Sequence, residues 1–597
     1  MRELVDLLTP WREAGELSAA EVHVAATLGR LSGESRPEVL LAAALAARAP
    51  RYGDVCIDLR TVASVAPAIE STVPVDWPAA DAWLEAVADS PLVTSTPAPL
   101  VLSGSLLYLE RYHAYETAVA HHLTRFASAP AAAIEADLSL LDSLFDGSLS
   151  AEQRRAVAAA GAGGLTVLVG GPGTGKTTTV AALLATLARS LGSLRVALVA
   201  PTGKAAARLG EAFRDAAAQL PADVAQAIAS AETSTVHRLL GAVGESSSRF
   251  RHHRQQSLPH DVVIVDETSM VSLPLMAHLL DAVRPGARVV LVGDPGQLAS
   301  VDAGSVLADI AGPMLTHADG DVAAPAPEGP LESCITVLTV SRRFPPGSPI
   351  DRLARAIGSG DAASARAVLA EGDEGDEADG PGAARGSVDW YPQPEVAVEA
   401  VRAIVEPVVV AVADAAAAGD AVAALAGLGA ARVLCAHRMG PMGVERWNER
   451  IEGWLAATGR PTSGWYPGRP VIITANDYRL GLFNGDLGVV VLLDGRPMVA
   501  FPTTAGPMFV APSRLEAAAT VHAMTIHKSQ GSEFDRAVVV LPPVGSRLAS
   551  RELLYTAVTR AKVGVTVVGS AESLDEVVGR RTVRASGLGD RLWSVTP

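Results

Sequence analysis

The chain has 597 residues, of which 49% are hydrophobic and 19% are charged, and its formal net charge is −16 at pH 7. This length exceeds what one hydrophobic core can organise, and we expect three or four domains of roughly 150 residues each. The negative charge argues against a protein that coats nucleic acid over its whole surface, although it leaves a local groove possible.

The cysteines and the N-terminus predict an intracellular location. Cys56, Cys334 and Cys435 are far apart, lie in apolar stretches and form no C-x-x-C pair, which fits a reducing cytosol without a metal site. The N-terminal residues are charged and polar, and no apolar run reaches the length of about eighteen residues that spans a membrane. We therefore expect a cytoplasmic protein with no membrane partner.

Residues 1 to about 145 carry helical patterns but no motif that we can attach to chemistry, and we predict a helical accessory domain that docks partners. Near its end, five residues recur at helical spacing and would share one helix face. That face is either core or a docking surface, because contiguous exposed aromatics promote association. The alternative is a Tyr and His nuclease centre of the relaxase kind, which needs a cluster of metal-binding histidines that we do not find. The five residues are Tyr108, Tyr112, Tyr115, Val119 and His122.

Beyond this domain, short apolar runs alternate with helical stretches, a pattern typical of buried parallel strands in α/β sheets. Residues 146–345 hold one set of runs, LTVLVG, RVALVAP, DVVIVDE and ARVVLVGD. Residues 346–597 hold a second set, RVLCAHR, PVIITAND, RAVVVLP and GVTVVGS. We predict a small inserted β domain at residues about 480 to 520, because short strands there alternate with Gly and Pro turns.

Three polar segments are predicted to be surface excursions: residues 246–260, 317–330 and 371–382. The last is acidic and rich in glycine, and we expect it to be disordered.

The strongest motif is a phosphate-binding loop directly after a predicted strand and before a predicted helix. Gly170, Gly175, Lys176 and Thr177 satisfy the pattern G-x-x-x-x-G-K-[ST]. In such a loop backbone N–H groups surround the β-phosphate, the lysine reaches the β and γ oxygens, and the hydroxyl ligates Mg²⁺. We therefore predict a site for ATP and Mg²⁺. The predicted loop residues are Gly170, Gly171, Pro172, Gly173, Thr174, Gly175, Lys176, Thr177 and Thr178.

Carboxylates and amides near other strands complete the predicted catalytic set. Asp266 ends an apolar strand and would hold Mg²⁺ through water, and Glu267 is the candidate base for the attacking water. Asp294 and Gln297 follow another strand, where a Gln can sense the γ-phosphate; an exposed Gln in an Asx-type turn is the alternative. Gln153 begins a helix shortly before the phosphate loop and is suited to reading the adenine edge.

Two arginines are placed to act on the γ-phosphate from a second lobe. Such a lobe closes on the nucleotide and opens when hydrolysis removes its charge partner. Arg343 lies where the first α/β set gives way to the second, and Arg560 lies near the C-terminus. Arg342 competes with Arg343 for the same role, so both stay candidates.

The order of these motifs resembles the complete series of superfamily 1 helicases. Between about 150 and 570 the chain carries, in order, Gln153, GGPGTGKTT, APTGKAAARL, TVHRLLG, VDETSM, GDPGQL, SRRF, TIHKSQGSEFD and YTAVTRAK. The variants APTGKAA and TIHKSQGSEF, with CAHRMGPMGVERWN and FNGDLG, resemble the RecD branch of that superfamily. The resemblance implies an α/β fold of two RecA-like P-loop motor domains with a small β insertion and a helical N-terminal domain.

The resemblance also implies an activity, partners and a DNA groove. It implies an ATP-dependent motor that moves 5′ to 3′ on single-stranded DNA from the tail of a duplex end, together with RecB-like and RecC-like subunits, in the repair of double-strand breaks. Glu533 would approach the ribose of ATP. Thr and Asn donors with a few cations suit tracking of the DNA backbone without base readout. The residues implied to line the groove are Thr202, Lys204, Thr235, His237, Asn484, Thr525, His527 and Lys528.

Other functions stay open on the sequence alone. A nuclease would need clustered Asp, Glu and Lys side chains outside the ATP motifs, which the sequence does not offer, so we expect no nuclease centre. A standalone RecD-like helicase, or a nucleotide-controlled assembly protein that binds DNA without translocating, would carry many of the same motifs. Unwinding assays on tailed duplexes would separate these alternatives.

Overall fold

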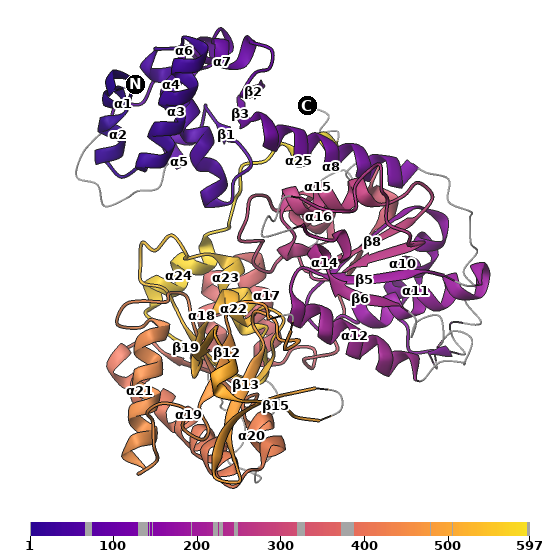
Figure 1. The fold of residues 1–597 in the computed structure, drawn as a ribbon, viewed down its shortest axis with the longest axis vertical. Coiled ribbons are helices and arrows are strands. Elements are labelled where there is room, and N and C mark those ends of the chain that lie inside the picture. Colours follow the sequence, from indigo (N-terminus) through magenta and orange to yellow (C-terminus); the bar gives the residue numbers. More distant parts are fainter. Residues whose placement is uncertain are drawn as a thin grey trace.

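The computed structural model places the chain in four units, an N-terminal domain, two α/β lobes and a small β domain that projects from the second lobe (Figure 1). The acidic segment 371–382 lies outside the described residues except for Glu371, and the segment 317–330 is described only at its ends. The structure describes residues 2–65, 75–128, 141, 144–145, 147–192, 194–218, 225, 231–243, 249–318, 329–371, 387–477, 479–503 and 506–593.

The N-terminal domain is helical, as predicted, and also contains a small antiparallel sheet in the order β1-β3-β2. Helix α4 (Pro37–Arg48) is apolar and is buried among its neighbours, and its residues Val39 and Leu45 are fully buried. The Trp83 indole N–H donates to the Glu38 carbonyl at 2.7 Å and ties α6 to α4. The remaining elements are α1 (Arg2–Leu7), α2 (Thr9–Glu13), α3 (Ala19–Ser32), η1 (Ala49–Tyr52), β1 (Ile57–Asp58), α5 (Val62–Val65), α6 (Ala80–Ala88), α7 (Pro91–Thr94), β2 (Leu100–Ser103) and β3 (Leu106–Leu109).

Helix α8 (Glu110–Ser128) leads from the N-terminal domain into the first lobe and packs in the core of that lobe. Val119 is fully buried there, and the Tyr115 ring lies 5.4 Å from the ring of His278 on α15 (Leu273–Ala282). The aromatic face predicted from the sequence therefore packs against the first lobe and is not a free docking surface. We propose that the N-terminal domain ends near residue 109 and not near 145.

The first lobe is a six-stranded parallel sheet in the order β6-β5-β7-β8-β4-β9. Its four predicted strands are present, and the edge strands β6 and β9 were not predicted. Alternate residues face opposite layers: Val167 packs with α8, α15 and α16, whereas Leu168 packs with α10, α11 and α12. The elements are α10 (Ala151–Ala162), β4 (Leu165–Gly170), α11 (Lys176–Leu191), β5 (Val196–Ala200), α12 (Gly203–Ala217), β6 (Glu232–Thr235), α14 (Val236–Leu240), β7 (Val262–Val265), η2 (Thr268–Met270), β8 (Arg288–Gly293), α16 (Val306–Ala318), η3 (Glu332–Cys334) and β9 (Ile335–Leu338).

The second lobe is a five-stranded parallel sheet in the order β10-β19-β18-β11-β17. Strands β11, β18 and β19 were predicted, whereas β10 and β17 were not. The elements are α17 (Pro349–Ser359), α18 (Ala362–Glu371), β10 (Ser387–Tyr391), α19 (Pro394–Ala417), α20 (Ala421–Gly427), β11 (Ala431–Cys435), α21 (Val444–Ala457), β17 (Ala523–Thr525), α22 (Ile526–Ser529), β18 (Phe534–Val540), α23 (Arg551–Val558), β19 (Ala561–Val568) and α24 (Ala571–Gly579).

The small β domain is a five-stranded antiparallel sheet in the order β15-β14-β13-β12-β16, and it begins before the predicted start near 480. Strand β12 was predicted as a parallel strand of the second lobe, and that prediction was wrong, because β12 pairs antiparallel with β13 and β16. Val471 and Ile472 are buried on opposite faces of the strand, so its sequence lacks polar alternation. The elements are β12 (Pro470–Ile473), β13 (Leu487–Leu493), β14 (Arg496–Phe501), β15 (Met508–Val510), η4 (Pro512–Arg514) and β16 (Ala518–Thr520).

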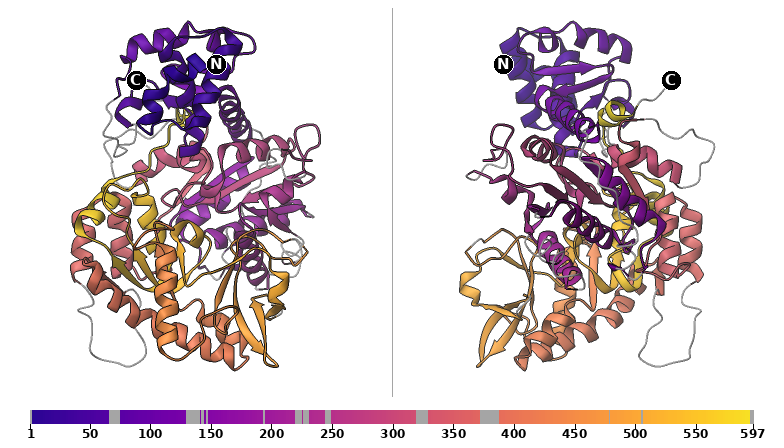
Figure 2. Two further views of the ribbon diagram at one scale, coloured as in Figure 1. Left: turned by 60° about the vertical axis from the view of Figure 1, so that its left-hand side comes forward. Right: turned by 90° about the vertical axis from the view of Figure 1, so that its right-hand side faces the viewer.

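After α24 the chain leaves the second lobe and returns to the first. This segment, residues 580–593, is the C-terminal strap, and it runs beside the N-terminal domain in Figures 1 and 2. Helix α25 (Leu588–Leu592) and Trp593 are buried in the core of the first lobe, where the Trp593 indole N–H donates to the Ile310 carbonyl at 3.1 Å. The strap is thus a second connection between the lobes, in addition to the chain segment near residue 345.

Candidate functional site

The phosphate loop between β4 and α11 contains two glycines in the left-handed region. Gly173 has a φ of 75° and Gly175 a φ of 83°, which other residues disfavour. Both are also crowded: a Cβ on Gly173 would lie 2.3 Å from the Arg343 Cβ, and one on Gly175 would lie 2.5 Å from the Gln153 Nε2. The loop is therefore packed between α10 and the connection to the second lobe.

Lys176 begins α11 with its ammonium group turned into the loop. The Nζ donates to the carbonyl oxygens of Gly170 at 2.6 Å and Gly171 at 2.9 Å. Thr177 and Thr178 follow in the first helical turn and are partly buried. The helix N-terminus and the ammonium group concentrate positive potential at the loop, as the binding of a phosphate requires.

Two further loop residues hold the loop closed. The Thr174 hydroxyl donates to the Gly171 carbonyl at 2.9 Å, and the Pro172 carbonyl accepts the Ser341 hydroxyl at 2.9 Å. The second bond links the loop to the segment that leads to the other lobe.

Gln153 supports the phosphate loop in this structure. Its Oε1 accepts the Ser150 N–H at 2.8 Å, and its own N–H donates to the Ser150 hydroxyl at 3.2 Å, so it completes the cap of α10. Its Nε2 donates to the Gly175 carbonyl at 3.3 Å. Both ends of the amide are engaged, and adenine recognition stays a prediction that requires this side chain to exchange partners.

Three carboxylates gather at the ends of β7 and β8. Burial and the neighbouring Glu267 raise the pKa of Asp266 to about 6. Burial also raises the pKa of Asp294, against the opposing charge of Lys176. Glu267 has a φ of 49°, a strained conformation that persists where the surrounding structure imposes it. Mg²⁺ is usually bound by one or two carboxylates together with waters and phosphate oxygens, so Asp266 with the Thr177 hydroxyl fits the ion.

A chain of buried hydrogen bonds joins the two lobes beside these carboxylates. The Gln297 Nε2 donates to Asp294 at 3.0 Å, and the Gln297 Oε1 accepts from Nη2 of Arg560 at 2.8 Å. Arg560 also donates to the Thr556 carbonyl at 3.1 Å and the Ser532 carbonyl at 3.4 Å. Gln297 is 7% exposed and Arg560 4%. Gln297 is therefore not an exposed turn residue.

Arg343 contacts the second lobe, whereas Arg342 contacts the segment before α10. The Arg343 guanidinium donates to the Thr559 carbonyl at 3.1 Å and forms an ion pair with Glu533. The Arg342 side chain is exposed and donates to the Ser148 carbonyl. Of the two candidates, the geometry favours Arg343.

Glu533 is held by several basic groups. Besides Arg343, it pairs with Arg208 at 2.9 Å and Lys562 at 3.8 Å. Burial alone would raise the pKa of Glu533, but Arg343 and Arg208 outweigh burial and lower it to about 2. Arg208 and Lys562 were not predicted as site residues. For Arg208 the signal was its position four residues after Lys204 on one helix, which places both on the same face.

Three threonines predicted to contact DNA cap helix N-termini. Thr202 caps α12, Thr235 caps α14 and Thr525 caps α22. Each hydroxyl accepts the backbone N–H three residues on, at 3.2, 3.2 and 3.3 Å respectively. A capping hydroxyl can still donate its own hydrogen, which a phosphate oxygen can accept.

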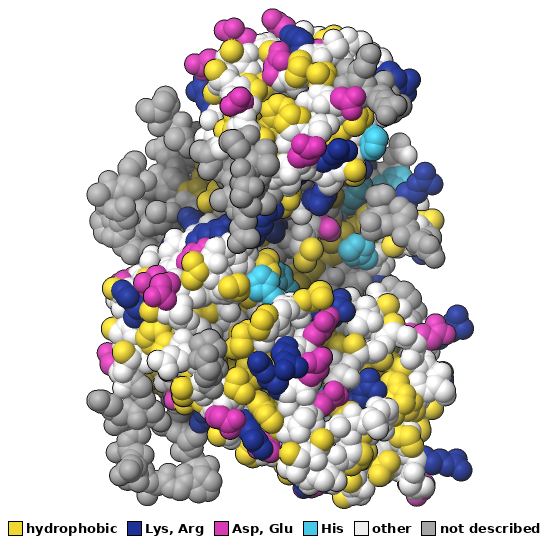
Figure 3. Space-filling model, turned by 90° about the vertical axis from the view of Figure 1, so that its left-hand side faces the viewer, with side chains coloured by type: hydrophobic (Ala, Val, Ile, Leu, Met, Phe, Trp, Pro, Cys, Tyr) yellow, Lys and Arg dark blue, Asp and Glu magenta, His cyan; other side chains and the backbone are white. Residues whose placement is uncertain are grey.

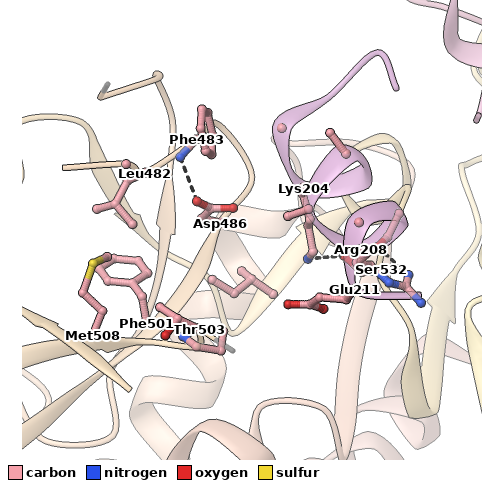
Figure 4. Close-up of a pocket in the computed structure, with 18 of the residues that line it drawn as sticks. Lys204, Arg208, Glu211, Leu482, Phe483, Asp486, Phe501, Thr503, Met508 and Ser532 are labelled. Carbon is pink, nitrogen blue, oxygen red and sulfur yellow. Dashed lines mark hydrogen bonds between the residues drawn. The ribbon is translucent and has the colours of Figure 1, made fainter. Parts of the chain in front are cut away.

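Lys204 and Thr235 line a cavity of about 860 Å³ between α12 and the small β domain. Figure 4 shows Lys204 and Arg208 on α12 at one side of this cavity and Asp486 at the other. The Lys204 Nζ donates to the Ser532 hydroxyl at 2.6 Å, and burial lowers the pKa of Lys204 to about 8. The cavity thus brings residues of both lobes and the insertion together.

The other predicted groove residues are absent from the described lining of that cavity. Asn484 and Lys528 are exposed, and the backbone N–H of Asn484 donates to the Asn476 side chain at 2.8 Å. His237 and His527 are both partly buried, and burial lowers the pKa of each imidazole. Of the eight predicted groove residues, Lys204 and Thr235 therefore line this cavity.

His237 and His527 share an electrostatic neighbourhood that the sequence did not indicate. The Asp302 carboxylate opposes the effect of burial on the pKa of His237, and Arg584 of the strap adds to it at His527. Asp302 and Arg584 are themselves in contact, because the Arg584 guanidinium donates to the Asp302 carbonyl at 3.0 Å. The two histidines therefore lie near one junction of loop and strap.

The described residues contain no group of three or more His, Cys, Asp or Glu side chains placed to hold a metal ion. His122 of α8 packs against the first lobe: its Nε2 lies 3.6 Å from Asp281, and burial lowers its pKa to about 4. None of the helices in the described part of the chain has the length and apolar character needed to cross a membrane.

Comparisons with known proteins agree along the whole chain. Residues 13–108 match the model for the N-terminal domain of RecBCD enzyme subunit RecD, residues 153–303 an AAA domain, and residues 520–568 a UvrD-like helicase C-terminal domain. The chain is 48% identical to RecBCD enzyme subunit RecD of Mycolicibacterium smegmatis, over 96% of this chain and 97% of the relative. The subunit of Mycobacterium tuberculosis is 45% identical over 99% of this chain and 98% of its own length. An ATP-dependent RecD2 DNA helicase of Deinococcus radiodurans is 35% identical over 72% of this chain and 50% of the relative.

Proposed function

Because the chain belongs to the family of RecBCD enzyme subunit RecD, we propose that it moves along single-stranded DNA by closing and opening its two lobes around ATP. It is an ATP-dependent DNA helicase subunit of a RecBCD-type complex. The finer proposal is a 5′ to 3′ motor that enters at the tail of a duplex end, beside RecB-like and RecC-like subunits, during processing of double-strand breaks in the cytoplasm.

The observation that carries this proposal is the hydrogen bond between Gln297 of the first lobe and Arg560 of the second, at 2.8 Å. Both side chains are buried, so the bond forms only while the lobes are closed. A γ-phosphate beside Gln297 gives Arg560 a charged partner, and hydrolysis removes it. The closed state is therefore stabilised before hydrolysis and destabilised after it, which is the cycle that a stepping motor needs.

The phosphate loop supplies the chemistry on the first lobe. Lys176 exchanges its carbonyl partners for the β and γ oxygens of ATP. Thr177 and Asp266 would hold Mg²⁺, which would neutralise part of the phosphate charge. Glu267 orients and deprotonates the attacking water, and Arg343 adds positive charge from the segment between the lobes.

The predicted groove residues are proposed to follow the DNA backbone. Hydroxyl, amide and imidazole groups with few cations allow release at each step, in keeping with a chain whose net charge is −16. Glu533 is proposed to approach the ribose of ATP, where its low pKa keeps it ionised as an acceptor. The proposed groove residues are Thr202, Lys204, Thr235, His237, Asn484, Thr525, His527 and Lys528.

An unwinding assay on tailed duplexes tests the proposal. With ATP and Mg²⁺ we expect the chain, alone or with its partner subunits, to unwind a duplex with a 5′ single-stranded tail, and we expect Lys176→Ala to abolish the activity. Unwinding that starts only from a 3′ tail would overturn the polarity. ATP hydrolysis without strand separation on either tail, by the assembled complex, would favour the assembly protein instead.

A further inference from the structure

The C-terminal strap passes from the second lobe to the first between Thr582 and Arg584. The backbone N–H of Thr582 donates to Glu552 of α23, in the second lobe, at 3.0 Å. Two positions later, Arg584 is bound to the first lobe. Val583 between them is 82% exposed. The two Cα–Cα steps from Thr582 to Arg584 span at most about 7 Å, so the strap has little slack, and a change in the distance between the lobes strains these contacts.

The Arg584 guanidinium holds the loop that follows Gln297. Its Nη1 donates to the carbonyls of Asp302 and Gly304, both at 3.0 Å, and its Nη2 donates to the Ser300 carbonyl at 2.7 Å. A planar fork that engages several carbonyls fixes the path of a loop more firmly than the point charge of a lysine. Residues 300–304, the Arg584-bound loop, are therefore held by a residue that belongs to the strap.

The N-terminal domain also packs against Arg584 and the Arg584-bound loop. Gly53 lies so near the guanidinium that a Cβ there would be 2.6 Å from the Cζ of Arg584. The Gly53 carbonyl accepts the Gly304 N–H at 2.9 Å, and the Asp54 carboxylate accepts the Ala585 N–H at 2.9 Å. In the space-filling view, Lys, Arg and His side chains lie in the region between the N-terminal domain and the lobes (Figure 3).

The Arg584-bound loop connects the nucleotide side of the junction to its DNA side. Directly after the sensor glutamine, the Leu298 N–H donates to the Thr556 hydroxyl of α23 at 2.9 Å. On its other side, the Leu298 carbonyl accepts the side-chain amide of Gln530 at 3.1 Å, and Gln530 directly follows α22, the helix that carries the predicted groove residue His527. Helix α23 and the strap, which both belong to the second lobe's part of the chain, thus hold successive parts of one loop of the first lobe.

We infer that Arg584 is a positioning residue that transmits lobe closure to the Arg584-bound loop and so sets the alignment of the DNA side of the junction. The inference rests on the proposed ATP-driven closure. The hydrogen bonds of Arg584 described here go to the loop and not to the phosphate loop or to Gln297. Its loss should therefore weaken the response to DNA more than the chemistry of hydrolysis.

The test compares the full chain with Arg584→Gln, Arg584→Lys and the control Arg581→Gln, which changes an exposed arginine of the same strap. ATP hydrolysis is measured without DNA and over a titration with oligo(dT). We expect Arg584→Gln to raise the half-saturating DNA concentration by about tenfold, Arg584→Lys by less, and Arg581→Gln not at all. Turnover without DNA should stay within about twofold of wild type in all three variants.

Hydrogen exchange gives a readout that does not depend on activity. In Arg584→Gln we expect faster exchange in peptides that cover 298–304 and unchanged exchange in the phosphate loop. Wild-type DNA response and exchange in this variant would overturn the inference. So would equal losses of basal and DNA-stimulated turnover with a lower melting temperature, because that pattern indicates a merely structural role. A wild-type chain without any stimulation by DNA would overturn the proposed function, and exchange would still decide whether Arg584 holds the loop.

Discussion

The nucleotide side and the DNA side of the interlobe junction are built from different kinds of groups. On the nucleotide side, the enclosed charges of Asp294 and Arg560 are linked through Gln297. On the proposed DNA side, Thr202 and Thr235 present hydroxyl groups at helix starts. A strongly charged enclosed site discriminates between the nucleotide states, whereas neutral donors bind a strand that has to be released at each step.

Because the two sides are built from different groups, they should respond differently to substitution. Removing an enclosed charge leaves a partner uncompensated, and its effect on turnover should be large. Removing one neutral donor among several should have a small effect on DNA binding. The following predictions order these effects from largest to smallest.

Lys176→Ala should lower kcat for ATP hydrolysis by at least about 10³-fold, because the ammonium group neutralises charge on the β and γ oxygens. The melting temperature should change little, since the side chain contacts only loop carbonyls at 2.6 and 2.9 Å. Steady-state ATPase measurements and calorimetry test the two halves. Turnover near that of wild type would remove the phosphate loop from the proposed site.

Arg560→Ala should lower kcat by roughly 10²- to 10³-fold and change nucleotide affinity far less, as expected for an arginine that acts in the transition state. The variant also leaves the buried acceptor of Gln297 unpaired, which costs about 1 to 3 kcal/mol. Arg560→Lys is the matched control, because it restores the charge without the planar fork. An unchanged kcat with weaker ATP binding would assign Arg560 to binding of the ground state.

The acidic groups of the site predict a pH dependence of the Mg²⁺ requirement. The pKa of Asp266 is raised to about 6, so acidification from pH 7.5 to pH 5.5 protonates a proposed metal ligand. We expect the half-saturating Mg²⁺ concentration for ATP hydrolysis to rise by about threefold or more over this interval. A requirement that is constant from pH 7.5 to 5.5 would contradict the assignment of Asp266.

The raised pKa of Asp266 also predicts how the folding stability depends on pH. A carboxyl whose folded pKa lies above its ordinary value of 3.8 destabilises the fold increasingly as the pH rises from about 4 to 6. Without Mg²⁺, Asp266→Asn should therefore raise the melting temperature at pH 7 and not at pH 4. Glu533→Gln should have the opposite sign at pH 7, because the pKa of Glu533 is lowered to about 2 and its ionised form stabilises the fold above its ordinary value of 4.5. Melting curves that moved in the same direction for both variants would refute this account.

The smallest effect is expected on the DNA side. Thr235→Val removes the hydroxyl of one cap while keeping the shape, and should weaken DNA binding by only a few-fold. It should also cost about 1 kcal/mol of stability through the lost cap. Thr235→Ser keeps the hydroxyl and serves as the control. If Thr235→Val abolished DNA binding altogether, the DNA side would not be built from many small contributions.

The sequence predicted those parts of the molecule in which local pattern and tertiary context agree. Strands such as β4 and β8 are buried on both faces between helices, so their apolar runs were sufficient. Strand β12 has the same apolar character for a different reason, since the small β domain covers one face and the second lobe the other. The edge strand β6, with the sequence ETST, has no apolar run at all.

The site shows the same limit. The phosphate loop and the position of Arg560 followed from motifs, because their chemistry requires those residue types at fixed spacing. The engagement of Gln153 with Gly175, and the triple contact of Arg584 with a distant loop, depend on which segments the fold brings together. The strap carries only a short helix, LGDRL, and no motif, so its return to the first lobe could not be predicted from local sequence.

The central claim is that Gln297 and Arg560 act as one link between the lobes, and a double-mutant cycle tests it most directly. DNA-stimulated kcat is measured for wild type, Gln297→Ala, Arg560→Ala and the double variant. Because the two side chains share one buried hydrogen bond at 2.8 Å, we expect the double variant to be no slower than Arg560→Ala within about twofold. Effects of the two substitutions that multiply independently would contradict the claim.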